Sequence, residues 1–395
     1  MSAHERPGSS RRPPLLMTAG VAWSARIALM LVSSIVAAAA VPDARLFPAA
    51  SRHAIVYHEP GRYACWPTDA GAWSWGDEIV VGFFKAYHKP DTPEDDHPYD
   101  RKQPVVLTLA RSRDGGETWT TKEHPEIDGG VARALTERID FSHPDLAIRV
   151  REGSFYVSRD RGRTWAGPYA FPDFGAGGLT SRTDYVVNGR DECLFFLSSK
   201  RELKVNDDRD GAFAVRTRDG GLTFEFLGWM TGKPYAARTV MPATVRASSG
   251  RLMSILQRRF DLDLSAGFRD EVSWLDAYGS GDDGRSWAFL ARIAYPDTIL
   301  HNGNPPSLVQ LPDGRLVTVY GVRAPPYGVR ARVSRDGGRA WGPEIFVRTD
   351  GRNWDLGYCR SFVRRDGRIL TAYYYSTAAQ PLQHIAATIW TPPAD

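Results

Sequence analysis

Acid–base chemistry could be carried by a small set of residues in the last hundred positions of the chain. Asp355 precedes Tyr358 by three residues, and His301 begins the segment His-Asn-Gly-Asn at 301–304. A carboxylate or an imidazole that takes up the phenolic proton makes a tyrosine usable as a nucleophile or proton shuttle. We therefore expect Asp355 or His301 to act on Tyr358, with Asn304 beside them as a binding residue.

Other polar residues stand at the edges of segments that read as strands. The segment 323–328 is Arg-Ala-Pro-Pro-Tyr-Gly, and its prolines make it stiff. Tyr327 in this segment is expected to contact a ligand. Arg182, Asp184 and Arg238 precede apolar runs further upstream.

The segment 89–100 is rich in carboxylates. It contains Asp91, Asp95, Asp96 and Asp100, any of which could donate a proton to a leaving group. Asp96 is our candidate, and the other three stay open. A solvated loop or a Ca²⁺ site are the alternatives for this run, the loop being the commoner outcome.

Three tryptophans follow one another closely near residue 70. The rings of Trp66, Trp73 and Trp75 could stack on the face of a sugar, although packing between strands is the commoner use of this side chain. Trp66 is our candidate for a binding role.

A repeated turn organises most of the chain. The string Ser-x-Asp-x-Gly-x-x-Trp occurs four times, and a fifth copy has Thr and Phe at its ends. The Asp carboxylate can accept turn N–H groups, the Gly tolerates positive φ, and the aromatic ring packs on a neighbouring strand. These carboxylates are therefore predicted to be structural. The copies begin at Ser112, Ser158, Thr217, Ser280 and Ser334.

The segments between these turns alternate as strands do, with glycine turns between them. Each unit reads as four strands, which is the pattern of a propeller blade. Five such units cover 61–349, and a sixth at 355–390 lacks its last strand. Residues 53–57 could supply that strand and close the ring, removing exposed sheet edges. We predict an all-β fold, a single six-bladed propeller over residues 41–395, with almost no helix.

Composition excludes several classes of protein. The 395 residues are 24% charged and 42% hydrophobic, which argues against a disordered chain or a polytopic membrane protein. The formal net charge is +4, and without residues 1–40 the charges nearly balance. No nucleic-acid partner, cofactor or metal is expected. The spacing of Cys65, Cys193 and Cys359 matches no metal motif, and a Cys65–Cys359 disulfide stays possible.

The amino end reads as a targeting segment. Arginines precede an apolar run at 27–41, which small residues end. This pattern predicts a secretory signal peptide over 1–40 and a secreted or periplasmic protein. An uncleaved membrane anchor is the alternative, although the run is shorter than the roughly 20 residues of a typical span.

The repeated turns and the six blades resemble the sialidase (neuraminidase) superfamily, in which the repeat is known as the Asp-box. The resemblance covers residues 53–390. It implies an exo-α-sialidase-like glycoside hydrolase that cleaves a terminal acidic sugar. The Asp-box itself is specific for fold and weak for function, because similar propellers include lyases, other glycosidases and binding proteins.

The resemblance also implies site residues. In this family three arginines from different blades hold the substrate carboxylate, since guanidinium and carboxylate groups pair bidentately. Arg62, either Arg258 or Arg259, and Arg323 stand in the matching places. The family nucleophile is a tyrosine that opens the last blade, and Tyr358 matches it.

The sequence departs from the family at its acid and base. The family base is a glutamate at the start of the fourth blade, but residues 239–244 contain none. The family acid is an aspartate in a loop of the first blade, and the carboxylates of 89–100 are not in its usual short motif. An Asp355–Tyr358 or His301–Tyr358 pair could replace the missing base.

Three functions remain open from the sequence. The first is a secreted hydrolase of a glycan with an anionic sugar. The second is a lyase on uronate-containing polysaccharide, with His301 and a tyrosine as base and acid. The third is a non-catalytic glycan-binding propeller. The expected partner in each is a glycan, and the expected state is a monomer.

Overall fold

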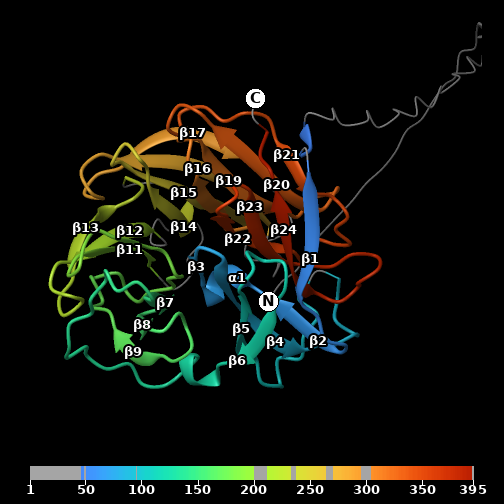
Figure 1. Ribbon diagram of the computed structural model, residues 1–395, viewed down its shortest axis with the longest axis horizontal. Helices are drawn as coiled ribbons and strands as arrows, with labels where there is room; N and C mark the ends of the chain where they lie inside the picture. Colours follow the sequence, from blue (N-terminus) through green and yellow to red (C-terminus); the bar gives the residue numbers. More distant parts are fainter. Residues whose placement is uncertain are drawn as a thin grey trace, which may run out of the picture. The chain divides into compact units, whose positions relative to one another are not determined.

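The computed structural model describes residues 46–48, 50–94, 96–199, 211–232, 237–263, 270–294 and 304–393. They belong to one compact unit. Six antiparallel sheets surround a central axis as the blades of a propeller, and the short helix α1 (Pro67–Ala70) lies close to that axis (Figure 1). A single 3-10 turn, η2 (Pro125–Ile127), is the other helical element described. No helix in these ranges has the length and apolar character of a membrane span. The predicted all-β six-bladed propeller is confirmed.

The blades follow one another along the chain. Blade one holds β2 (Arg62–Cys65), β3 (Ala72–Trp75), β4 (Glu78–Tyr87), β5 (Val106–Ser112) and β6 (Thr120–Glu123). Blade two holds β7 (Ala147–Arg151), β8 (Ser154–Ser158) and β9 (Ala166–Ala170). Blade three holds β10 (Tyr185–Val187), β11 (Cys193–Ser198), β12 (Ala212–Thr217) and β13 (Glu225–Trp229). Blade four holds β14 (Arg238–Arg246), β15 (Leu252–Asp263), β16 (Asp270–Ser280) and β17 (Ala288–Ala294).

The last two blades complete the ring. Blade five holds β18 (Ser307–Gln310), β19 (Leu316–Val322), β20 (Gly328–Ser334) and β21 (Ile345–Arg348). Blade six holds β22 (Gly357–Val363), β23 (Ile369–Tyr375), β24 (His384–Trp390) and β1 (Ser51–Tyr57). In this blade β1 pairs antiparallel with β24, with Ala54 opposite Ala387. The prediction that residues 53–57 supply the missing strand is therefore confirmed.

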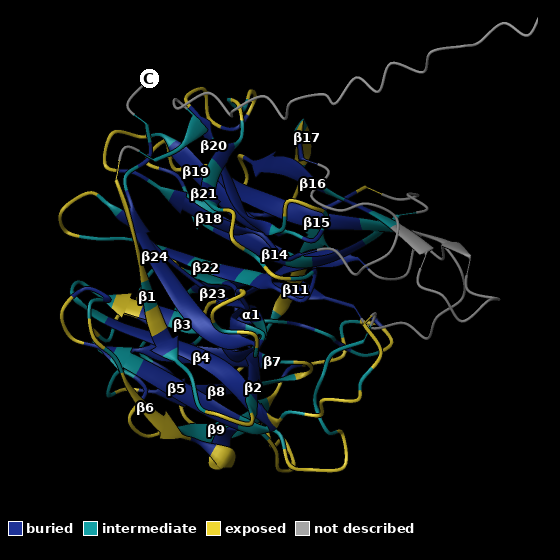
Figure 2. Cartoon of the chain, turned by 90° about the vertical axis from the view of Figure 1, so that its right-hand side faces the viewer, coloured by how far each residue is buried: buried dark blue, intermediate teal, exposed yellow. Residues whose placement is uncertain are grey.

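Burial follows the position of a strand within its blade. The middle strands β11, β12, β23 and β24 are buried at every residue, whereas the outer strand β6 is exposed throughout (Figure 2). A middle strand packs against neighbouring blades on both faces, so it reads as an unbroken apolar run instead of an alternating one. The hydrophobic core thus lies between the blades.

All five repeated turns have the predicted hydrogen bonds. In the second, Asp160 Oδ1 accepts the N–H groups of Arg163 and Thr164, each at 2.9 Å. Ser158 Oγ donates to Asp160 at 2.7 Å and accepts the N–H of Gly162 at 2.8 Å. Burial alone would raise the pKa of Asp160, but these donors outweigh it and lower the pKa to about 2. The carboxylate is fully engaged in the turn, as expected for a structural group.

The turns also join one blade to the next, which gives a stability prediction. Gly116 has φ +95°, and a Cβ there would lie 1.8 Å from Leu370 Cδ1 in blade six. Gly116→Ala is expected to lower the free energy of unfolding by about 2–4 kcal/mol through strain and overpacking. Gly153→Ala, where a Cβ meets nothing within 4 Å, is the control and should cost less than about 0.5 kcal/mol. Urea unfolding measures both, and equal midpoints would contradict the packing described.

Blade two differs from the predicted four strands, because its sheet has three. Arg149, on β7, is fully buried. Its guanidinium donates to the carbonyls of Ile127 at 2.7 Å and Ala70 at 3.3 Å. Burial lowers the pKa of Arg149 to about 10, so the side chain remains charged at neutral pH. This arginine ties blade two to α1 and so helps to hold the helix at the axis.

The three cysteines are free and buried, so the possible Cys65–Cys359 disulfide does not form. Burial raises the pKa of each thiol, with nearby negative charges adding to the effect at Cys65 and Cys193. Buried neutral thiols pack as small apolar groups.

Candidate functional site

The inner strand of blade one is broken, and the break brings a carboxylate to the axis. Trp66 has left-handed backbone angles, φ 55° and ψ 57°, which end β2. Pro67 then begins α1, which Gly71 ends at φ 94°. Asp69 lies on this single turn of helix. Strain of this kind in a non-glycine residue is common at functional sites, where the surrounding structure maintains it.

Asp69 forms an ion pair with Arg182, which precedes the inner strand of blade three. Arg182 Nε lies 2.6 Å from Asp69 Oδ1, but the two groups are not aligned as a hydrogen bond. Arg182 Nη1 donates to the carbonyl of Thr180 at 3.0 Å, which fixes the guanidinium. Burial would lower the pKa of Arg182, but the charge of Asp69 outweighs it and raises the pKa. Arg182 therefore stays charged beside the carboxylate of Asp69.

Tyr358 shares the electrostatic field of this pair. Its backbone is left-handed at φ 54°, and its N–H donates to Asn304 Oδ1 at 2.9 Å. Burial and the negative charge of Asp69 raise the pKa of Tyr358 to about 12, against the opposing charges of Arg323 and Arg182. A phenol with this pKa is neutral at pH 7 and needs a base before it can attack.

Asn304 is held by a close approach of two blades. It is fully buried, and a Cβ on Gly357 would lie 1.9 Å from its Oδ1. Glycine at this position, with φ +108°, is what allows the amide to reach the N–H of Tyr358. Asn304 therefore positions the tyrosine backbone through its oxygen, while its Nδ2 has no hydrogen-bond partner among the described residues.

Asp355 is the centre of a buried network beside Tyr358. It accepts hydrogen bonds from the hydroxyls of Tyr63 and Tyr374, each at 2.8 Å, and contacts His97 Nδ1 at 2.7 Å. Burial would raise the pKa of Asp355, but His97, the charge of Arg323 and the Tyr374 hydrogen bond lower it. The carboxylate is saturated by these partners, so its contacts are those of a positioning group.

Arg323 links this network to Tyr358. Its Nη2 donates to the hydroxyl of Tyr374 at 2.7 Å, and its Nε and Nη2 donate to the carbonyl of Leu356 at 3.3 Å. The guanidinium carbon lies 5.7 Å from the centre of the Tyr358 ring. The side chain is 3% exposed. Asp355 thus orients Tyr374, which in turn accepts a hydrogen bond from Arg323. The guanidinium of Arg323 lies against the ring of Tyr358.

A pocket of about 230 Å³ opens beside the Asp69–Arg182 pair. Trp66 forms part of its wall, with its ring centroid 5.3 Å from that of His97. Glu152 also lines it, from the turn between β7 and β8, with φ 50°. The N–H of Glu152 donates to the carbonyl of Ser181 at 3.0 Å, and its charge acts on Arg182. The pocket therefore has three carboxylates and an aromatic wall. Asp128 is paired with Arg149 and Arg151, which leaves Asp69 and Glu152 as the candidates for chemistry. The residues that line it are Trp66, Asp69, Phe84, Val105, Asp128, Arg151, Glu152 and Arg182.

Two expected site residues of blade one have surface partners. Arg62 pairs with Glu59 at 3.4 Å and lies 3.6 Å over the ring of Tyr87. Strand alternation turns the next residue, Tyr63, inward to Asp355. Asp96 forms a two-pronged contact with Arg101 at 2.6 and 2.9 Å, and it also accepts the N–H of His97.

The predicted arginines of blade four have local partners too. Arg258 is buried and donates to the hydroxyl of Tyr278 at 3.1 Å and to the carbonyl of Ala237 at 3.4 Å. Arg259, the next residue on β15, pairs in register with Arg238 on β14. Arg62, Arg258 and Arg323 thus bind different partners in three blades, and the arginines whose charges act on Tyr358 are Arg182 and Arg323.

The other expected residues have mixed placements. Tyr327 is partly buried, packs on the core between blades five and six, and accepts the N–H of Gly351 through its carbonyl at 3.3 Å. His301 lies outside the described residues. No group of three or more His, Cys, Asp or Glu among the described residues is arranged to hold a metal ion.

Sequence reasoning did not single out Asp69 and Glu152, which line the pocket, or His97, which contacts Asp355. The signal for Asp69 was the Trp-Pro-Thr-Asp-Ala-Gly string, in which proline and glycine bracket one helical turn within a strand. Glu152 and Gly153 form the two-residue turn between β7 and β8. This sequence is typical of a β-hairpin and does not by itself indicate a functional residue. His97 contacts Asp355 across 258 positions, and no local pattern marks such a contact.

Comparisons with known proteins agree with this architecture. A family model described as a BNR repeat-like domain matches residues 146–371, more than half of the chain. No curated protein matches the sequence. A protein of unknown function from Dyadobacter fermentans is 20% identical with a TM-score of 0.61, over 86% of this chain and 98% of that one.

Two enzymes of known structure are more distant. An α-L-arabinanase from Penicillium chrysogenum, solved with arabinobiose, is 14% identical with a TM-score of 0.52, over 87% of this chain and 99% of that one. A sialidase from Trypanosoma rangeli is 14% identical with a TM-score of 0.46, over 79% of this chain and 52% of that one. At these identities the likeness concerns the fold.

Proposed function

Because the chain belongs to the BNR repeat-like domain family, with a sialidase-like propeller, we propose that it is a secreted or periplasmic glycoside hydrolase. Its active site is the pocket lined by Asp69, Glu152 and Arg182, and Tyr358, which lies within the electrostatic influence of Asp69 and Arg182, is the proposed nucleophile. The observation that carries the proposal is the Asp69–Arg182 ion pair, whose facing atoms lack hydrogen bonds in a pocket walled by Trp66. The fold alone would not carry it, since propellers serve many functions.

The groups at the pocket can be assigned to the steps of a retaining hydrolysis. Tyr358 Oη attacks the anomeric carbon while its proton passes to Asp69, which takes the place of the missing glutamate. Glu152 donates a proton to the leaving oxygen as the glycosidic bond breaks. It then removes a proton from the water that cleaves the tyrosyl–sugar bond, and Asp69 returns the proton to Tyr358.

The substrate of this proposal carries an acidic terminal sugar, of the sialic-acid class. Arg182 and Arg323 support it, because both charges act on Tyr358 and a sugar carboxylate between them would gain two guanidinium partners. A neutral arabinan is the second candidate. The separate partners of Arg62, Arg258 and Arg323 favour it, as does the likeness to an arabinanase.

Release of aryl groups from three glycosides tests the proposal. The full chain is incubated with an aryl α-sialoside, β-glucuronide and α-L-arabinofuranoside, beside Arg182→Gln. The exposed Arg190→Gln is the matched control. We expect release from an acidic glycoside, a loss of at least about 100-fold in Arg182→Gln and no change in the control.

Other outcomes decide between the alternatives. Release from the arabinofuranoside alone would select the neutral substrate. An unsaturated product absorbing in the ultraviolet from uronate polysaccharide would replace hydrolysis by elimination. Binding to glycans without any turnover would make the chain a binding protein.

A further inference from the structure

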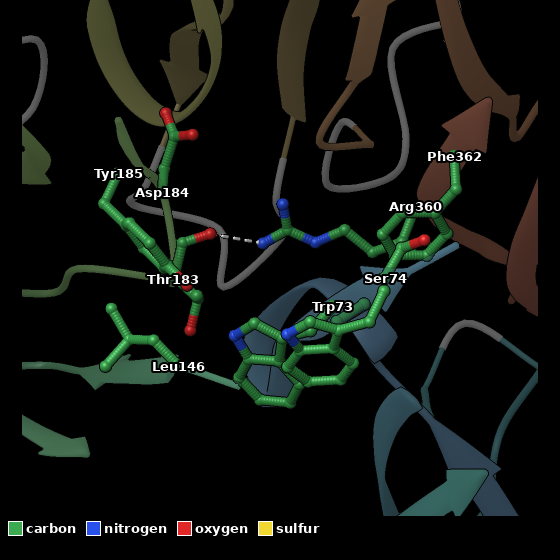
Figure 3. A pocket seen from close by; sticks show the side chains of 10 residues that line it. Trp73, Ser74, Leu146, Thr183, Asp184, Tyr185, Arg360 and Phe362 are labelled. Carbon is green, nitrogen blue, oxygen red and sulfur yellow. Dashed lines mark hydrogen bonds between the residues drawn. The ribbon is translucent and has the colours of Figure 1, made fainter. Parts of the chain in front are cut away.

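A second pocket, of about 360 Å³, lies further along the same inner strands (Figure 3). Gly357 begins β22, and Arg360 and Phe362 of this pocket stand two and four residues after Tyr358. The two pockets share no lining residue. In blade one, Trp73 and Trp75 line this pocket from β3, which follows the helix α1 that contains Asp69. This second pocket, here called the channel pocket, is therefore separate from the proposed active site. Its lining residues are Ala72, Trp73, Ser74, Trp75, Leu146, Thr183, Asp184, Tyr185, Arg360 and Phe362.

A guanidinium with unused donors projects into the channel pocket. Arg360 Nη2 donates to the carbonyl of Thr183 at 2.7 Å (Figure 3). It also donates to the carbonyl of Thr68 at 3.1 Å, and the two bonds fix the side chain. Its Nε is buried without a hydrogen-bond partner among the described residues. A buried arginine whose donors are incompletely used favours an anionic or polar ligand, because such donors carry a desolvation penalty until they are paired.

The carboxyl group of Asp184 does not neutralise this guanidinium by a direct contact. Its Oδ1 accepts the N–H of Thr244 at 3.3 Å, and its Oδ2 has no hydrogen-bond partner among the described residues. Burial raises the pKa of Asp184 to about 7, against the opposing charge of Arg360. A large fraction of Asp184 is therefore protonated near neutral pH, which leaves Arg360 as the dominant charge.

Aromatic side chains form the remaining walls. Trp73 is held by its Nε1 donating to the carbonyl of Ile148 at 3.2 Å and by the ring of Trp165 at 5.3 Å. Trp75, Tyr185 and Phe362 are partly exposed around it. Fixed aromatic faces beside a cation suit a compact ring that carries an acid group, since the ring face stacks and the acid pairs with the guanidinium.

We propose that the channel pocket is a second binding site, for one carboxylate-bearing sugar residue, held by Arg360 and stacked on Trp75. The site binds without cleaving, and it would keep an acidic glycan on the propeller independently of the active site. It does not require the proposed hydrolase activity.

Calorimetric titration of the full chain with free glucuronate tests this site. The background is Asp69→Asn, so that turnover does not contribute. Trp75→Ala removes the stacking face, and Ser74→Tyr fills the pocket from an exposed position without removing core contacts. Phe289→Ala, which removes an exposed ring outside both pockets, is the matched control. We expect glucuronate binding weakened at least 10-fold by Trp75→Ala and by Ser74→Tyr, but unchanged by Phe289→Ala.

Three results would overturn the proposal: no binding of glucuronate, binding insensitive to Ser74→Tyr, or equal affinity for neutral glucose. If the chain binds glucuronate in this way but hydrolyses no glycoside, the binding-site proposal stands and the hydrolase proposal fails. Because Ser74→Tyr leaves the buried aromatic residues in place, its folding can be verified independently of Trp75→Ala.

Discussion

Asp69→Asn is expected to lower kcat by about 10²–10⁴-fold on the glycoside that the unaltered chain hydrolyses best. The amide keeps the size of the side chain but cannot take the proton of Tyr358, and with a pKa near 12 that phenol does not ionise unaided. The ion pair with Arg182 is lost at the same time. KM should change less than kcat, because the main loss is in the step that breaks the glycosidic bond.

The control for this prediction is Asp77→Asn in the same blade. Asp77 is 48% exposed and pairs with the exposed Arg365 at 3.2 Å, so its loss should leave kcat within about twofold and stability within about 0.5 kcal/mol. Activity of Asp69→Asn within threefold of the unaltered chain would remove Asp69 from the mechanism. A matching far-ultraviolet circular dichroism spectrum shows that the loss is chemical.

Asp355→Ala is expected to destabilise the protein by about 3–5 kcal/mol. The change leaves the hydroxyls of Tyr63 and Tyr374 without their acceptor and removes the carboxylate that balances Arg323. All of these groups are buried, so water does not replace the lost partner. Urea unfolding at pH 7 measures the difference, with the exposed Asp91→Ala as control.

The same carboxylate gives a pH dependence with a defined sign. The folded pKa of Asp355 lies below its ordinary value of 3.8, so the folded state favours the ionised form. Its contribution to stability is fully present above about pH 4 and is lost as the pH falls through the folded pKa. The stability gap between the unaltered chain and Asp355→Ala should therefore narrow below about pH 4. A constant gap down to pH 2 would contradict the network.

The fold could be predicted from the sequence because its signals are local. Each Asp-box encloses its own hydrogen bonds within a few residues, as Ser158 and Asp160 show, and the repeats fix the number of blades. Closure by residues 53–57 followed from counting strands, without any knowledge of contacts. Blade two was the exception, because its sheet has three strands where four were expected.

The site was harder to predict because its contacts are long-range and depend on register. A single step along β2 decides that Tyr63, and not Arg62, faces Asp355. Asp355 was expected to act on Tyr358 from three residues away. In the structure the backbone is left-handed at Tyr358, and Asp355 contacts Tyr63, Tyr374 and His97. Its action on Tyr358 stays a prediction.

The pairing of β1 with β24 has a consequence for how the chain reaches its native state. His53 Nδ1 and Thr388 Oγ1 lie 2.8 Å apart across 335 positions of sequence. Closing a loop of that length costs about 5 kcal/mol of chain entropy, before the pair gains any packing. β1 therefore stays unpaired until β24 has formed, and the ring closes late in folding. Folding of this propeller should be slow for its size, and a fragment lacking β1 would leave the outer edge of β24 open to association with other chains.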